Sequence, residues 1–188
     1  MDQRSLDGAH SEVRRRLELV GADQWTRPTP CDDWSVTDLV AHMAVGATMT
    51  CRILAGEPWD REPVVQEVSA APDLATEWKD RTAEERAAFA TPALLSSHVE
   101  HPVMGRIPCA QFLGMRVGDA LLHAWDLARA IDADDRLDPE LVGEVWALMS
   151  PMADFIGQSG FFGSGPSGDV GEDAPLQVRL LDLSGRRP

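Results

Sequence analysis

Apolar residues recur along most of this chain at the three- and four-residue spacing of amphipathic helices. The first such segment covers residues 5–21 (SLDGAHSEVRRRLELVG). A second helix is expected to begin at Ser35, a hydroxyl cap with a carboxylate three residues later, and to run to Gly56. Two further periodic segments lie at roughly 73–90 and 111–131. Four helices of this kind predict a helix bundle.

The segments between these helices carry other signals. Residues 57–73 contain three prolines and predict an irregular connection. Residues 94–110, with β-branched side chains and a central Met-Gly, predict a short hairpin or extended crossover. An Asp-Pro-Glu start predicts a fifth helix over 138–157, followed by a glycine-rich loop over 157–175. A short last helix is expected within 175–185.

The expected fold is therefore all-α: a four-helix bundle with a short hairpin crossover and a small C-terminal helix. We find neither an internal repeat nor a linker long enough to separate two domains, so residues 1–188 are expected to form a single domain. Hydrophobic residues at 44% and charged residues at 26% are typical of a globular domain with a sizeable core.

Charge narrows the possible partners. A net charge of -14 argues against binding to nucleic acid or to an anionic membrane, because both require a basic surface. The sequence has no apolar run of about 20 residues, and its N-terminus does not resemble a signal peptide. A cytoplasmic location is therefore expected. Cys31, Cys51 and Cys109 form no CxxC pair, which argues against a disulfide framework and favours buried thiols.

Candidate chemistry gathers on the helix that contains RVGDALLHAWDLARA, residues 116–130. Asp119, His123 and Asp126 share one stripe of this helix, because positions i, i+4 and i+7 stack on the same side. Carboxylate and imidazole groups four residues apart can chelate a single cation. Asp119 and His123 are therefore a candidate ligand pair, although such a pair is also common on solvated helix faces.

His42 is the best candidate for a third ligand. It lies among apolar positions in LVAHMAV, where an imidazole is costly unless a partner satisfies it. Such a partner is either a backbone carbonyl in the core or a metal ion shared with the later helix. Three protein ligands would leave a position open for water or substrate. His10 is expected on an exposed face, and His98 and His101 flank the hairpin, where surface roles are expected.

Two neighbouring residues have open roles. Asp126 either forms a surface salt bridge with Arg129 or Arg116, or accepts the second N–H of a ligating imidazole and so fixes its tautomer. Trp125 is either a core anchor or part of a pocket wall beside the site.

The segments PTPCDDWSVTDLVAHM and HAWDLARA resemble those of the DinB/YfiT-like metalloenzymes. They are closer still to the branch around the N-terminal domain of mycothiol-dependent maleylpyruvate isomerase. The resemblance covers nearly the whole chain and implies a four-helix bundle that holds a divalent metal at one end. By motif, the implied ligands are His42, Asp119 and His123. The implied ion is zinc, with nickel as the alternative.

The resemblance also implies a function. A metal-activated small-molecule thiol, mycothiol or a relative, would add to an electrophilic substrate, as in a thiol S-transferase. A zinc-hydroxide hydrolase and a non-catalytic metal- or ligand-binding module remain alternatives. The resemblance to the family also implies a homodimer. Asp119 stands where the isomerase has glutamate, and the chain ends where the isomerase continues into a second domain. Maleylpyruvate isomerisation itself is therefore not implied.

Overall fold

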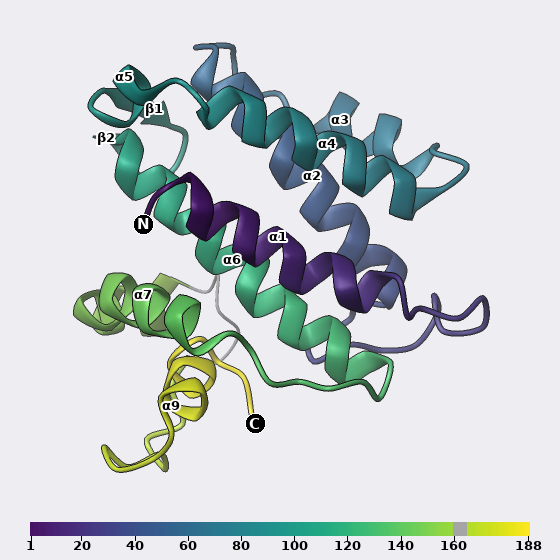
Figure 1. Cartoon of the computed structure of the whole chain (residues 1–188), viewed down its shortest axis with the longest axis vertical. Coiled ribbons are helices and arrows are strands. Elements are labelled where there is room, and N and C mark those ends of the chain that lie inside the picture. The colour runs from purple at the N-terminus through teal and green to yellow at the C-terminus, as the bar shows by residue number, and fades with distance from the viewer. Residues whose placement is uncertain (160–164) are drawn as a thin grey trace.

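Four helices form the centre of the molecule. They are α1 (Gln3–Leu17), α2 (Val36–Leu54), α4 (Leu74–Phe89) and α6 (Cys109–Ala130). In this computed structural model, which describes residues 1–159 and 165–188, α1 packs mainly on α6 and α2 mainly on α4 (Figure 1). Contacts of α1 with α4 and of α2 with α6 close the bundle. The expected all-α four-helix bundle is confirmed.

Local capping explains where these helices begin. The Ser35 hydroxyl accepts from the backbone N–H of Asp38, and the Asp38 carboxylate accepts from the backbone N–H of Ser35, which is the expected capping box. Asp2 and Asp73 cap α1 and α4, each accepting backbone N–H groups of the first turn. Helix α6 has no side-chain cap and follows directly from Pro108 of the hairpin.

The apolar stripes of the four helices meet in one core. Its fully buried members include Leu6, Ala9, Val13, Leu39, Val40, Phe89, Leu113, Val117, Leu121 and Leu127. Burying one such leucine contributes about 1.5–3 kcal/mol relative to leaving it exposed. The periodicity of the sequence therefore identified the faces on which the bundle closes.

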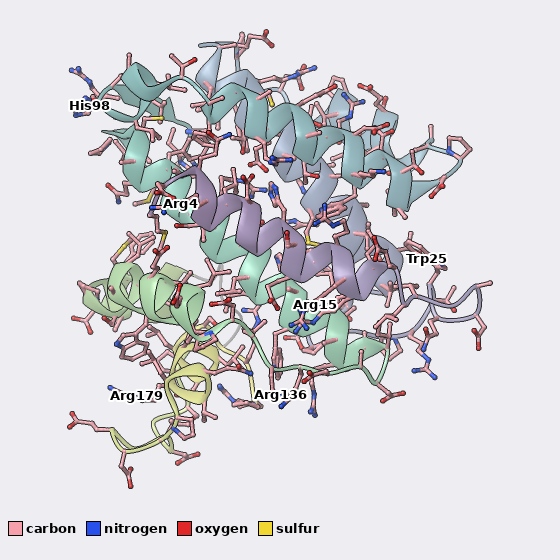
Figure 2. The ribbon with its side chains drawn as sticks, viewed as in Figure 1. Arg4, Arg15, Trp25, His98, Arg136 and Arg179 are labelled. Carbon is pink, nitrogen blue, oxygen red and sulfur yellow. The ribbon has the colours of Figure 1, made fainter. Side chains whose placement is uncertain are left out.

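A two-stranded hairpin precedes α6, as predicted. Strands β1 (His98–His101) and β2 (Gly105–Pro108) are antiparallel, and Val99 pairs with Ile107 on the buried face. The short helix α5 (Pro92–Leu95) leads into it. His98, the first residue of β1, is exposed, and Figure 2 shows it at the edge of the molecule.

Two expectations about the helices were wrong. Residues 57–73 are not wholly irregular, since α3 (Glu62–Ser69) lies among them. Pro63 stands in the first turn of α3, where proline needs no hydrogen-bond partner, and the buried Val64 and Val68 lie one turn apart. The first helix also stops at Leu17, four residues before the expected glycine.

The predicted fifth helix is interrupted. It begins at its Asp138 cap as α7 (Pro139–Met149), passes through a 3-10 turn at Ser150–Met152 and continues as α8 (Ala153–Ser159). Pro151 causes the break, because it has no N–H to continue the helical ladder.

The C-terminal helix is confirmed as α9 (Leu176–Leu183), which packs on α7 beside the bundle (Figure 1). Of the predicted glycine-rich loop, residues 165–175 contain neither helix nor strand, and 160–164 lie outside the described residues. Within the described chain, no helix is both long enough and apolar enough to cross a bilayer.

Candidate metal centre

Three side chains that the sequence places on two separate helices converge in the structure. His42 comes from α2, and Asp119 and His123 come from successive turns of α6. Asp119 Oδ1 lies 3.5 Å from His42 Nε2 and 3.4 Å from His123 Nε2. One ligand atom from each of the three residues lies within 4.8 Å of the other two.

This spacing fits a single bound cation. Tetrahedral zinc with bonds of about 2.0–2.1 Å places neighbouring ligand atoms roughly 3.3–3.4 Å apart. The two distances from Asp119 Oδ1 match that separation closely. The aspartate therefore reaches the position of a direct ligand although its side chain is one methylene shorter than glutamate.

The three groups form a site that is open on one side. The side chains of His42 and Asp119 are 29% and 26% exposed, whereas that of His123 is 10% exposed. A site with three protein ligands and a solvent-facing side is the arrangement of catalytic zinc centres, in which an exchangeable molecule completes the coordination.

Asp126 holds the second ring nitrogen of His123. Its Oδ2 lies 2.9 Å from His123 Nδ1, so a proton on Nδ1 leaves the Nε2 lone pair directed towards Asp119. Of the two expected arginine partners, Arg129 instead pairs with Asp135 and Arg116 with Asp119. The surface salt bridge considered for Asp126 is therefore wrong, and this carboxylate has no exposed surface.

Arg116 holds the outer oxygen of Asp119. Its Nη1 donates to Asp119 Oδ2 at 2.8 Å, and its Nε donates to Glu85 Oε1 at 2.7 Å. Behind them, His10 Nε2 lies 3.1 Å from Glu85 Oε2. His10 is only 7% exposed, so the expectation of a surface histidine was wrong: its ring turns inward to a carboxylate from α4.

These contacts set the charge of the site. Burial opposes the charged form of Asp119, but the positive charges of Arg116 and His123 outweigh it and hold the pKa of this carboxyl well below its usual value. Burial lowers the pKa of His42 despite the nearby Asp119, which favours the neutral imidazole that a metal requires. For His123, Asp119 and Asp126 overcome burial and raise its pKa well above the usual value.

Comparison with known proteins identifies the family of this chain. Residues 6–128 match the family described as the mycothiol maleylpyruvate isomerase N-terminal domain. This chain belongs to that family. Two uncharacterised Mycobacterium tuberculosis proteins, Rv0738 of strain H37Rv and MT0763 of strain CDC 1551, are each 37% identical to it over 129 residues. The match covers 68% of this chain but only 66%, just under two thirds, of each relative.

Solved structures share the fold. The mycothiol-dependent maleylpyruvate isomerase and a His-to-Ala variant of it superpose on this chain with TM-scores of 0.62 and 0.63 at 22% identity. Each superposition covers 83% of this chain and 69% of the other. The bundle is therefore the DinB-like fold of the isomerase branch.

The family match includes all three converging residues but not every residue at the centre. Arg186, which lies beyond residue 128, donates from Nε and Nη2 to the two oxygens of Asp126 at 2.9 and 2.5 Å. Its charge outweighs the effect of burial and holds the pKa of Asp126 at about 2. Cys31 also donates, from Sγ to Asp126 Oδ2 at 3.3 Å.

An aromatic wall was also missed in the sequence. The ring of Trp34 lies 4.6 Å from that of His42 and 6.0 Å from that of His123. Trp125, for which a core role and a pocket wall were both considered, is buried, with the Arg129 guanidinium 5.6 Å from its ring centroid. The available signal for Trp34 was its place just before the Ser35 cap, within the segment that resembles the family.

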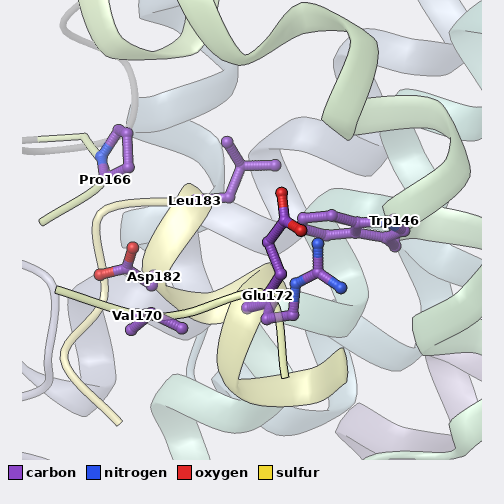
Figure 3. Close-up of a pocket in the computed structure, with 7 residues that line it drawn as sticks. Trp146, Pro166, Val170, Glu172, Asp182 and Leu183 are labelled. Carbon is purple, nitrogen blue, oxygen red and sulfur yellow. The ribbon is translucent and has the colours of Figure 1, made fainter. Parts of the chain in front are cut away.

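A hollow of about 150 Å³ lies outside the matched family region (Figure 3). Trp146 and Arg179 form one wall, with the guanidinium 4.6 Å from the ring centroid, and Asp182 lies across from them. This volume is below the roughly 300–1,000 Å³ of ordinary small-molecule sites. The size of this hollow therefore argues against an ordinary small-molecule site there.

Proposed function

We propose that this protein binds one divalent cation, zinc or alternatively nickel, through His42, Asp119 and His123. We further propose that it is a mycothiol-related enzyme that transfers a small-molecule thiol to an electrophilic substrate. The observation that carries the proposal is the convergence of the three donors at the spacing of a tetrahedral centre that is open on one side. Borderline nitrogen and oxygen ligands suit both metals.

The residues around the three proposed ligands have different roles. Asp126 fixes the His123 tautomer, Arg116 holds the outer oxygen of Asp119, and the Trp34 ring excludes water from one side of His42. The cation, when bound, supplies a positive charge that lowers the pKa of a thiol or water at the open side. Mycothiol is proposed as the thiol because the solved isomerase of the same fold is mycothiol-dependent.

The carboxylates favour thiol transfer over the alternative of hydrolysis. A hydrolase needs a free general base beside the bound water. Among the described residues next to the centre, Asp126 is held by Arg186 and Glu85 by Arg116. Neither carboxylate is therefore free to take a proton from bound water, whereas a thiol, with an ordinary pKa of about 8.5, can lose its proton to solvent at the open side. The same open side argues against a closed structural module.

The first experiment measures metal content by plasma mass spectrometry in the wild type and in His42→Ala and His123→Ala. The control is His98→Ala, which removes an exposed histidine from the hairpin (Figure 2). We expect near-stoichiometric zinc or nickel in the wild type and the control, and its loss in both site variants. Mycothiol titration should then change the absorption of a cobalt-loaded sample. A wild type that takes up no metal after reconstitution overturns the proposal.

A further inference from the structure

His123 belongs to two sets of candidate ligands at once. One set is His42, Asp119 and His123, and the other is Cys31, His123 and Asp126. The first lies on the side of the His123 ring that faces Asp119, and the second on the side of Nδ1, which lies 2.9 Å from Asp126 Oδ2. Some feature of the fold must therefore decide which side receives a cation.

Arg186 contacts Asp126, which belongs only to the second set. Its Nε and Nη2 contact opposite oxygens of Asp126, which is the two-point grip that a guanidinium makes with a carboxylate. The remaining nitrogen, Nη1, donates to the carbonyl of Ser184 at 3.0 Å. The side chain is only 10% exposed, so the guanidinium is committed to this contact and is poorly placed to receive a substrate.

A backbone turn at the end of α9 positions Arg186 beside the candidate centre. At the end of α9, the N–H of Gly185 donates to the Asp182 carbonyl and the N–H of Arg186 to the Leu181 carbonyl. These two bonds make a Schellman turn, and Gly185 supplies the positive φ of 79° that the turn requires. The turn reverses the chain so that Arg186 reaches Asp126 on α6, 60 residues earlier.

We propose that Arg186 is a positioning residue that selects between the two ligand sets. By holding both oxygens of Asp126, it commits that carboxylate to hydrogen bonding with His123 and keeps it from binding a cation together with Cys31. The cation is thereby directed to His42, Asp119 and His123. This inference rests on the proposed function and adds a residue from outside the family match.

Cobalt(II) provides the test, because thiolate ligation produces a near-ultraviolet sulfur-to-cobalt band that nitrogen and oxygen ligands do not. The proteins compared are the full chain, Arg186→Gln, Arg186→Gln with Cys31→Ser, and the neighbouring control Arg187→Gln. Arg187 pairs with Asp182 at 3.3 Å. Affinity is measured by competition with a chelator, and folding by circular dichroism.

We expect no sulfur band in the wild type or the control. Arg186→Gln should weaken cobalt binding about 10–100-fold, the usual cost of removing a partner behind a ligand, and should show the sulfur band. Adding Cys31→Ser should abolish the band. If Arg186→Gln does not fold, Arg186→Lys is measured in its place. Lysine keeps the charge but cannot contact both oxygens of Asp126 as a guanidinium does, so the sulfur band should appear.

Three results overturn the inference: a sulfur band in the wild type, unchanged affinity and spectrum in the folded variant, or weaker binding with no sulfur band. In all three, a wild type that binds cobalt leaves the proposed function standing. A wild type that binds no cobalt and no zinc overturns the proposed function, and the inference falls with it.

Discussion

Glu85 and Arg116 form a buried ion pair directly behind the candidate metal centre, with 2.7 Å between Oε1 and Nε. Glu85 comes from α4 and has no exposed surface, whereas Arg116 comes from α6 and also holds Asp119. The pair therefore contributes both to the stability of the bundle and to the position of Asp119, a proposed ligand.

Glu85→Gln should destabilise the fold by about 3 kcal/mol, because it removes the more deeply buried of the two carboxylates that pair with Arg116 and leaves only Asp119 to balance its charge. Urea unfolding followed by circular dichroism measures the loss. Glu84→Gln is the matched control, since the neighbouring Glu84 side chain is 60% exposed and its removal should cost less than about 0.5 kcal/mol. Equal stabilities for the two variants would contradict the buried pair.

The same pair predicts a dependence of stability on pH. Burial alone would raise the pKa of Glu85, but Arg116 and His10 outweigh it and hold the value at about 2, compared with 4.5 ordinarily. A depressed folded-state pKa contributes stability above the unfolded value, and that contribution disappears as the pH falls towards 2. It amounts to about 3 kcal/mol.

The free energy of unfolding should therefore fall in the wild type between about pH 5 and pH 2. Glu85→Gln lacks this contribution, so its deficit relative to the wild type should shrink as the pH decreases. Asp126 contributes in the same range, but equally in both proteins. A deficit that stays constant across this range would show that Glu85 does not carry the charge assigned to it.

Gly46→Ala should destabilise the protein by about 1 kcal/mol, against the usual gain for alanine in a helix. A Cβ at this position would lie 3.0 Å from Arg116 Nη1, and Glu85 and Asp119 prevent the guanidinium from retreating. Gly143→Ala in α7 is the control, because its Cβ would meet nothing within 4 Å and should stabilise by about 0.5–1 kcal/mol. Thermal unfolding of both variants tests the contrast in sign.

Asp119→Glu should bind zinc about tenfold more weakly than the wild type, although it keeps the charge. Asp119 Oδ1 already lies at ligand spacing from both histidines, so an extra methylene must displace them or lose the Arg116 contact. Asp119→Asn tests the contribution of charge alone, because the asparagine side chain has the length of aspartate but carries no charge. Chelator competition measures both, and tighter binding by the glutamate variant would contradict direct ligation by the shorter side chain.

Much of the fold could be predicted because its causes are local. The Ser35 cap, the hairpin before α6 and the apolar stripes of the four bundle helices each depend on residues within a few turns of one another. Asp119 and His123 were found in the same way, since the 3.6-residue period of a helix alone puts them on one side. His42 was found because an imidazole among apolar neighbours needs a partner.

The remaining features depend on which distant segments meet. The burial of His10 depends on Glu85 from another helix, and neither residue carries a local sign of the other. Cys31 and Arg186 reach Asp126 only because a loop and a C-terminal turn close on α6. Local patterns in the sequence predicted the four bundle helices and the proposed ligands on them. Which charges stand behind those ligands depends on tertiary packing, because local periodicity sets the direction of a side chain but only packing sets its partner.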